Sequence, residues 1–113
     1  MSHLRVEMRE TTAIVADFFH VTIRELHNRR RTNPHVETAR MYAVYFCRQR
    51  TGASLHQLGD FFRRDHSTCN YHVELVKKLI AGRDREVARH VSSIVAQLTR
   101  LMPVPVLAME KAA

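Results

Sequence analysis

Four consecutive polar residues follow a pair of arginines and directly precede an apolar stripe. A helix cap accounts for one polar residue at such a place, but not for four. The imidazole of His66 and the hydroxyl of Ser67 can donate to or accept from base edges, and Thr68 can offer its hydroxyl to a phosphate and its methyl group to thymine. The guanidinium groups suit phosphates. The pattern therefore indicates contact with DNA. The six residues are Arg63, Arg64, Asp65, His66, Ser67 and Thr68.

Asp65 carries the one negative charge in this segment, and phosphates repel a carboxylate. Two roles are compatible with its position. The carboxylate can cap the helix that follows, or it can accept a hydrogen bond from a cytosine amino group. Both roles stay open at this point, and one residue can fill both.

A second basic feature is the run Arg29, Arg30 and Arg31, in a polar stretch expected to be a loop. Arginines on a loop suit the narrow, negative minor groove of DNA. Between residues 24 and 50, seven arginines face two glutamates, which leaves a local charge of +5. A solvated basic surface is the commoner explanation of a charge run. Two separate basic features, each at a loop or a helix start, favour a DNA-binding surface instead.

The polar segment requires a particular pair of helices to present it. Ser54 and Gln57 form a capping box that predicts a short helix to Phe62. A three-residue turn over 63–65 then leads to a longer helix, which begins at Asp65 or His66 and ends before Gly82. A short helix, a tight turn and a longer helix make a helix-turn-helix, whose second helix places its first residues in the major groove.

The remaining chain supplies a helical framework. Thr22 and Glu25 form another capping box, and Asn33 with Pro34 marks a helix start. We predict an all-α bundle of about five to six helices. The boundaries are an N-terminal extension over 1–10, a domain over 11–101 and a flexible tail over 102–113. Further helices are expected over 13–19, 22–26, 34–50 and 84–101, with Val36, Ala39, Ala43, Phe46 and Cys47 as the buried stripe of the third.

The length and the net charge of the chain limit the kinds of function that it can have. The chain has 113 residues, enough for one domain, and a formal net charge of +7. Nucleic acid is the leading partner for that charge; an acidic protein or an acidic membrane surface are the alternatives. No apolar run approaches the roughly 18 residues of a membrane span, and the first residues do not read as a secretory signal. Two cysteines in such a chain fit a reduced, cytoplasmic setting.

Metal binding and catalysis are weaker hypotheses. Cys69 and His72 have helical spacing, but the cysteines lie on apolar stripes and no C-x-x-C pair occurs. Asp65, His66 and Ser67 include the residue types of a catalytic triad, yet adjacent residues at a helix start point in different directions. We therefore expect no metal, no cofactor and no enzymatic activity.

The order of the motifs along the chain resembles a known family. The segments 15–26, 39–46 and 54–59 precede the element Arg64-Asp65-His66-Ser67-Thr68. This series is similar to the C-terminal DNA-binding domain (domain IV) of the bacterial chromosomal replication initiator DnaA, over roughly residues 12–100. The sequence has no G-x-x-x-x-G-K-[ST] motif, so we expect a stand-alone domain without the ATPase of that family.

The resemblance implies a fold and a set of contacts. The fold is a TrpR/DnaA domain IV-like helix-turn-helix, and the partner is double-stranded DNA at short asymmetric boxes. Arg31, with Arg30 as the fallback, matches the arginine of the minor groove. A full-length replication initiator at shared sites is a possible further partner. The implied base readers are Arg31, Asp65, His66 and Ser67, and the implied backbone contacts are Arg64, Thr68 and Lys77. The other basic residues of the two features, Arg29, Arg30 and Arg63, are expected at the backbone because of their charge.

These observations predict a sequence-specific DNA-binding domain with a role in replication initiation or its regulation, in the cytoplasm and on the nucleoid. A transcriptional regulator or a nonspecific DNA binder of the same fold is one alternative. A basic protein-interaction module is another.

The chain departs from the family at the turn, where Phe62 is followed by Arg63 rather than by glycine.

Overall fold

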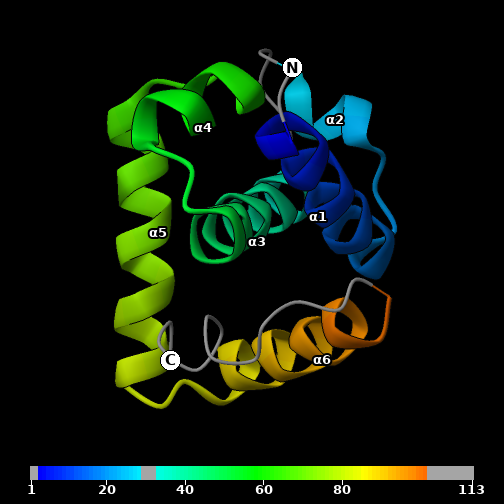
Figure 1. The fold of residues 1–113 in the computed structure, drawn as a ribbon. Helices are drawn as coiled ribbons and strands as arrows, with labels where there is room; N and C mark the ends of the chain where they lie inside the picture. The colour runs from blue at the N-terminus through cyan, green and yellow to red at the C-terminus, as the bar shows by residue number, and fades with distance from the viewer. Residues whose placement is uncertain (1–2, 29–32, 102–113) are drawn as a thin grey trace.

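Six helices make up the described part of the chain in a computed structural model, which describes residues 3–28 and 33–101 (Figure 1). Within these ranges there is no β-strand, and the predicted all-α fold is confirmed. The tail over 102–113 lies outside the described residues. The helices are α1 (His3–Phe19), α2 (Ile23–His27), α3 (Pro34–Thr51), α4 (Leu55–Phe62), α5 (His66–Ala81) and α6 (Arg85–Leu101).

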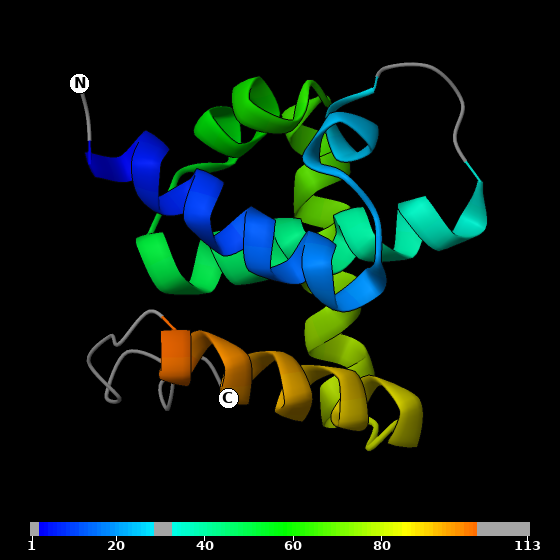
Figure 2. The ribbon, with the colours of Figure 1, turned by 90° about the vertical axis from the view of Figure 1, so that its right-hand side faces the viewer.

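Helix α3 lies at the centre, and α1, α2, α4 and α5 pack around it. The five residues predicted as its apolar stripe are all buried. Tyr42, Val44 and Tyr45 are buried as well, because neighbouring helices cover more than one side of α3. Helices α2 and α4 lie at one end of the molecule and α6 lies at the opposite end (Figures 1 and 2). The buried helix α3 thus separates the end of the molecule that α2 and α4 form from the end that α6 forms.

The predicted helix starts are confirmed by their capping bonds. Thr22 caps α2 in a reciprocal box with Glu25, and Ser54 does the same for α4 with Gln57. Asn33 accepts a hydrogen bond from the Val36 backbone N–H at 2.9 Å at the start of α3. These bonds satisfy amide groups that have no partner within their own helices. Local chemistry alone thus sets where three helices begin.

The start of α1 differs from the prediction. This helix begins at His3, so the boundary expected near residue 10 falls inside it. Met8 is buried, and Thr12 is buried with its Oγ1 3.4 Å from the Cys47 Sγ. The inward face of α1 has few apolar residues before Val15, and two of its buried residues are Thr11 and Thr12. In the sequence these threonines indicate a helix start, because threonine is a common N-cap residue. Packing against α3, rather than a cap, explains their position.

The turn between α4 and α5 is closed by a contact between two backbone segments. The Arg64 N–H donates to the Gly59 carbonyl at 2.9 Å, and Arg63 adopts the left-handed conformation with φ 57° and ψ 45°. A Cβ atom at residue 59 would lie 2.6 Å from the Arg64 carbonyl oxygen. The turn itself has no glycine; the space it needs comes from Gly59, inside the preceding helix.

Replacement of Gly59 by alanine should lower the free energy of unfolding. An alanine inside a helix normally adds about 0.5–1 kcal/mol of stability. Here the added methyl group must displace the backbone of the turn, since the contact of 2.6 Å is too short. We expect a net loss of about 1–3 kcal/mol, as for other overpacked sites, measured by urea unfolding.

Gly82→Ala is the matched control for this substitution. A Cβ there would meet the Lys78 carbonyl oxygen at 3.4 Å, and the backbone φ of −81° suits any residue. Its stability should stay close to that of the wild type. A Gly59→Ala variant at least as stable as the Gly82→Ala variant would contradict this account of the turn.

Candidate nucleic-acid interface

The first residues of α5 are exposed at the end of the molecule where α2 and α4 lie. The side chains of Asp65 and His66 are 66% and 51% exposed, and Ser67 is exposed as well. Thr68 is half-buried. Helix α5 begins beside α4 and runs from there toward α6 (Figure 1). The polar segment therefore faces solvent, as a helix that enters a groove of DNA requires.

Asp65 caps helix α5. Its carboxylate accepts a hydrogen bond from the Ser67 backbone N–H at 3.1 Å, and the same Oδ1 lies 3.3 Å from Nδ1 of His66. The bonds from Ser67, and after them the neighbouring His66, hold the pKa of this carboxyl below its ordinary value. The capping role that the sequence left open is confirmed. The role as a base acceptor stays a prediction.

His66 is held from two sides. Its ring lies with its centroid 4.3 Å from that of His56 on α4, and its Nδ1 faces Asp65. The second ring nitrogen, Nε2, is then the one that can meet a base edge. Sequence reasoning missed His56, because its position in the first turn of α4 gives no sign of which residue of α5 it meets.

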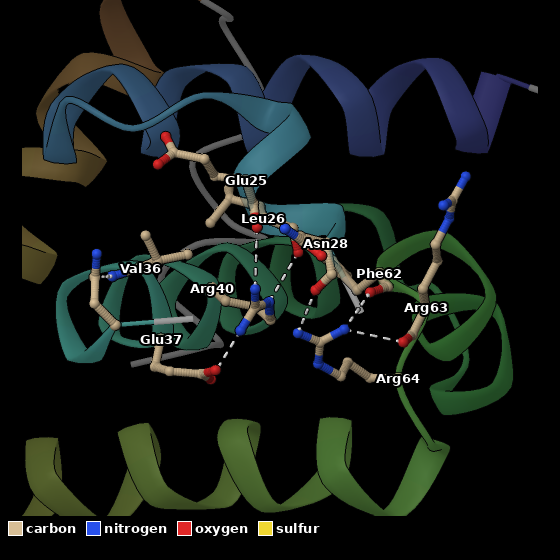
Figure 3. A network of polar contacts seen from close by, with 10 residues as sticks. Glu25, Leu26, Asn28, Val36, Glu37, Arg40, Phe62, Arg63 and Arg64 are labelled. Atoms are coloured by element: carbon tan, nitrogen blue, oxygen red, sulfur yellow. Dashed lines mark hydrogen bonds and ion pairs between the residues drawn. The ribbon is translucent and has the colours of Figure 1, made fainter. Parts of the chain in front are cut away.

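Arg64 does not point outward from the turn. Its Nη2 donates to the Asn28 carbonyl at 2.8 Å, and its Nη1 donates to the Arg63 carbonyl at 3.1 Å (Figure 3). The side chain thus joins the turn of the helix-turn-helix to the residue that follows α2. The structure gives Arg64 a structural role that the sequence did not predict, and its phosphate contact stays a prediction.

Arg40 is buried in α3, although its charge was counted with the basic surface. Its Nε donates to the Leu26 carbonyl at 2.8 Å and its Nη2 to the Glu25 carbonyl at 3.2 Å. Its Nη1 forms an ion pair with Glu37 at 2.8 Å (Figure 3). A cation is favourable at carbonyls that end a helix. Its position four residues after Val36, on the predicted apolar stripe, is the signal that could have identified it.

The three arginines predicted to enter or approach the minor groove, Arg29, Arg30 and Arg31, lie outside the described residues. The structure does place both flanks of this segment. Asn28 is bound through its carbonyl by Arg64, and Asn33 caps α3. The two residues that flank the segment, Asn28 and Asn33, are therefore held by the turn of the helix-turn-helix and by the central helix, respectively.

The other predicted contacts are divided between two places. Arg63 is exposed at the turn and its side chain extends toward α1 (Figure 3). Lys77 is half-exposed, with its Nζ 3.7 Å from a carboxylate oxygen of Glu74. At 1.5 Å per residue, Lys77 lies about 16 Å along α5 from His66. The structure thus gathers residues 63–68 at one end and places Lys77 farther along the same helix.

The cysteines take no part in this surface. Cys47 and Cys69 are free thiols and both are buried. Burial raises the pKa of Cys47 to about 12 and that of Cys69 to about 11. In the described ranges, no group of three or more histidine, cysteine or acidic residues is arranged to hold a metal ion.

Among the residues that the structure describes, none of the helices combines the length and the hydropathy needed to cross a bilayer.

The arrangement of α4, the turn and α5, with its exposed polar start, defines a helix-turn-helix domain. Residues 9–76 match the sequence model of the family described as the bacterial dnaA protein helix-turn-helix. The chain is also 34% identical over 95 residues to the chromosomal replication initiator protein DnaA of Mycobacteroides abscessus. That alignment covers 84% of this chain and 19% of the relative, so the chain spans about a fifth of the relative's length. The chain belongs to the bacterial DnaA helix-turn-helix family, and the resemblance seen in the sequence is confirmed.

Replacement of Arg40 by methionine should destabilise the domain. The apolar side chain fills similar space but removes the side-chain donor of the Leu26 carbonyl and leaves the Glu25 carbonyl with the Asn28 backbone N–H alone. We expect the free energy of unfolding to fall by about 2–4 kcal/mol, measured by urea unfolding.

Glu37→Gln serves as the comparison for Arg40. Glu37 is half-exposed, and glutamine keeps an oxygen that can accept from Arg40 Nη1, so this substitution should cost less than Arg40→Met. If Arg40→Met proves no more damaging than Glu37→Gln, the carbonyl bonds of Arg40 do not support α2.

Substitutions of Asp65 should separate its cap from its charge. Asp65→Ala removes the acceptor for the Ser67 N–H and should lower the Tm more than Asp65→Asn, which keeps an acceptor and loses only the charge. Because the pKa of Asp65 is lowered in the folded chain, the contribution of its charge is present above the ordinary Asp pKa and is lost as the pH falls through the lowered value. Thermal unfolding by circular dichroism at pH 7 and at acid pH measures both effects. Equal Tm values for the two variants at pH 7 would exclude the cap.

Proposed function

We propose that this chain binds duplex DNA in a sequence-specific way, at boxes of the kind that replication initiators recognise, and acts in the initiation of DNA replication or its regulation. The observation that carries the proposal is the exposed, capped start of α5, with Asp65, His66 and Ser67 on its first turn. The similarity to a protein named a chromosomal replication initiator supports the biological setting.

The start of α5 is suited to the major groove. That groove is wide enough for a helix and presents a different pattern of donors and acceptors for each base pair. His66, positioned by Asp65 and His56, offers Nε2, and Ser67 offers a hydroxyl. Asp65 keeps acceptor capacity beyond its capping bond and can receive a cytosine amino group.

Phosphate contacts would fix the helix in the groove. Arg63 and Thr68 flank the reading residues, and Lys77 extends the contact along α5. Arg64 can reach a phosphate only from a side chain already bound to Asn28, so its first contribution is to the geometry of the turn. The net charge of +7 favours such contacts at every DNA sequence alike.

The arginine run would read the adjacent minor groove. Arg31 is the proposed reader and Arg30 the alternative, with Arg29 on the backbone. The hydrogen bond from Arg64 to Asn28 supports this part of the proposal, because it holds the residue that precedes the segment beside the turn that leads into α5. A chain that binds initiator boxes would also compete with a full-length initiator at shared sites, on the nucleoid.

Three alternative functions share the same basic surface. A nonspecific DNA binder or a transcriptional regulator would also bind duplexes, and a protein-interaction module would bind an acidic protein instead. Selection of bound sites from random DNA, followed by titration of the selected duplex and a scrambled one at several salt concentrations, distinguishes specific binding from nonspecific binding and from a protein-interaction module. The selected sequence itself then shows whether the site is an initiator-type box, as the proposed function requires, or a site of another kind. About six phosphate contacts predict a slope of log K against log salt near about −5, and specific binding predicts a preference of about 10³-fold or more for the selected duplex.

His66→Ala tests the reading role of α5 directly. We expect a loss of about 1–3 kcal/mol on the selected duplex and a weaker preference over scrambled DNA, because a base contact is lost. Lys77→Ala should weaken both duplexes alike. Fluorescence anisotropy measures both affinities. Unchanged preference in the His66 variant would show that another element reads the bases.

A further inference from the structure

A cleft of about 370 Å³ lies between the first half of α1, α2 and the end of α4. Arg5 and Arg9 reach it from α1, and Arg63 reaches it from the turn. The acidic group in its lining is Asp60, so the charged side chains sum to +2. Arg5 lies with its guanidinium carbon 5.7 Å from the centre of the Phe61 ring, which places that charge at the wall of the cleft. We call this site, defined by Arg5, Arg9 and Arg63, the arginine cleft.

The electrostatics of the cleft are visible at His27, which also lines it. The pKa of His27 lies below its ordinary value, first because the ring is half-buried and next because Arg63 is close, with Arg5 adding to the effect. Arg63 and Arg5 thus come from elements far apart in sequence, and both lower the pKa of the same residue, His27. Charges that converge in this way make a positive potential where an anion can sit.

The cleft adjoins the surface proposed to read bases. Arg63 and Asp60 line it, and they also line a second cleft of about 440 Å³ together with Gly59, Arg64 and Asp65. Arg63 stands between the two, at the left-handed end of α4, and extends toward α1 (Figure 3). A continuous path therefore leads from the start of α5 to α1.

We propose that the arginine cleft binds a backbone phosphate of the same duplex, beside the base pairs that α5 reads, so that α1 forms part of the DNA-binding surface. This inference rests on the proposed function. A phosphate suits the site because planar guanidinium groups bind it with paired hydrogen bonds. The first half of α1 then extends the contact with DNA beyond the helix-turn-helix.

Arg9→Gln tests the proposal and Arg89→Gln is its matched control. Both residues are exposed on helices, and both substitutions remove one positive charge, but Arg89 lies on α6, at the opposite end of the molecule from α2 and α4 (Figure 1). Affinity for the selected duplex is measured by anisotropy across a range of salt concentrations, after circular dichroism shows that each variant is folded. We expect Arg9→Gln to weaken binding about 3–10-fold and to reduce the salt slope by about 0.9, the effect of one lost phosphate contact, without loss of preference over scrambled DNA. Arg89→Gln should change neither the affinity nor the slope.

Shortened duplexes locate the contact. Removal of base pairs from one end, but not from the other, should abolish the difference between the wild type and Arg9→Gln. Equal slopes for Arg9→Gln and Arg89→Gln would overturn the arginine cleft while wild-type binding leaves the proposed function in place. A wild type that shows no preference for any selected duplex would overturn the proposed function, and with it this inference.

Discussion

The close contact between Gly59 and the backbone of Arg64 determines how the rest of the surface is arranged. Only a residue without a side chain allows the carbonyl of Arg64 to pass this near to α4. That approach sets the relation of α4 to α5 and leaves the first turn of α5 in solvent. It also sends two consecutive arginines in different directions, because Arg63 takes the left-handed conformation and Arg64 turns back toward Asn28. The absence of a side chain at residue 59 thus determines the positions of the proposed base readers and of Arg63 and Arg64.

The arginines of this chain are not equivalent, and net charge alone does not describe them. Arg40 is in the interior, where the carbonyls of α2 and the carboxylate of Glu37 offset the cost of burying a charge. Arg64 is half-buried and bound to backbone carbonyls. Arg63 and Arg9 are exposed and line a cleft. A basic composition therefore contains structural cations that hold the loops and surface cations that are suited to a polyanion.

Much of the fold could be predicted because its signals are local. The capping residues Thr22, Asn33 and Ser54 fix helix starts through bonds to amides three positions away, which a sequence displays directly. The motif at residues 64–68 identified the family for the same reason. The length of α1 was missed because its inward face uses threonines, whose burial depends on α3.

The parts of the site that were missed depend on contacts between distant residues. His56 meets His66, Arg64 meets Asn28, and Arg63 meets the cleft formed with α1 only once the helices are packed. The spacing of apolar residues predicts which face of a helix is buried, but it does not predict which residue of another helix packs against that face. Arg40 is the intermediate case, since its place on the stripe of Val36 was visible but its charge favoured a surface position.

Arg63 occupies a backbone conformation that a residue with a side chain adopts at a cost of about 1 kcal/mol or more. Glycine would relieve this strain without any change in the course of the chain. The chain instead keeps a long cationic side chain at the most strained point of the turn, between two clefts. The domain is thus less stable than its own backbone permits, and the consequence is a positive charge held at the turn beside the start of α5.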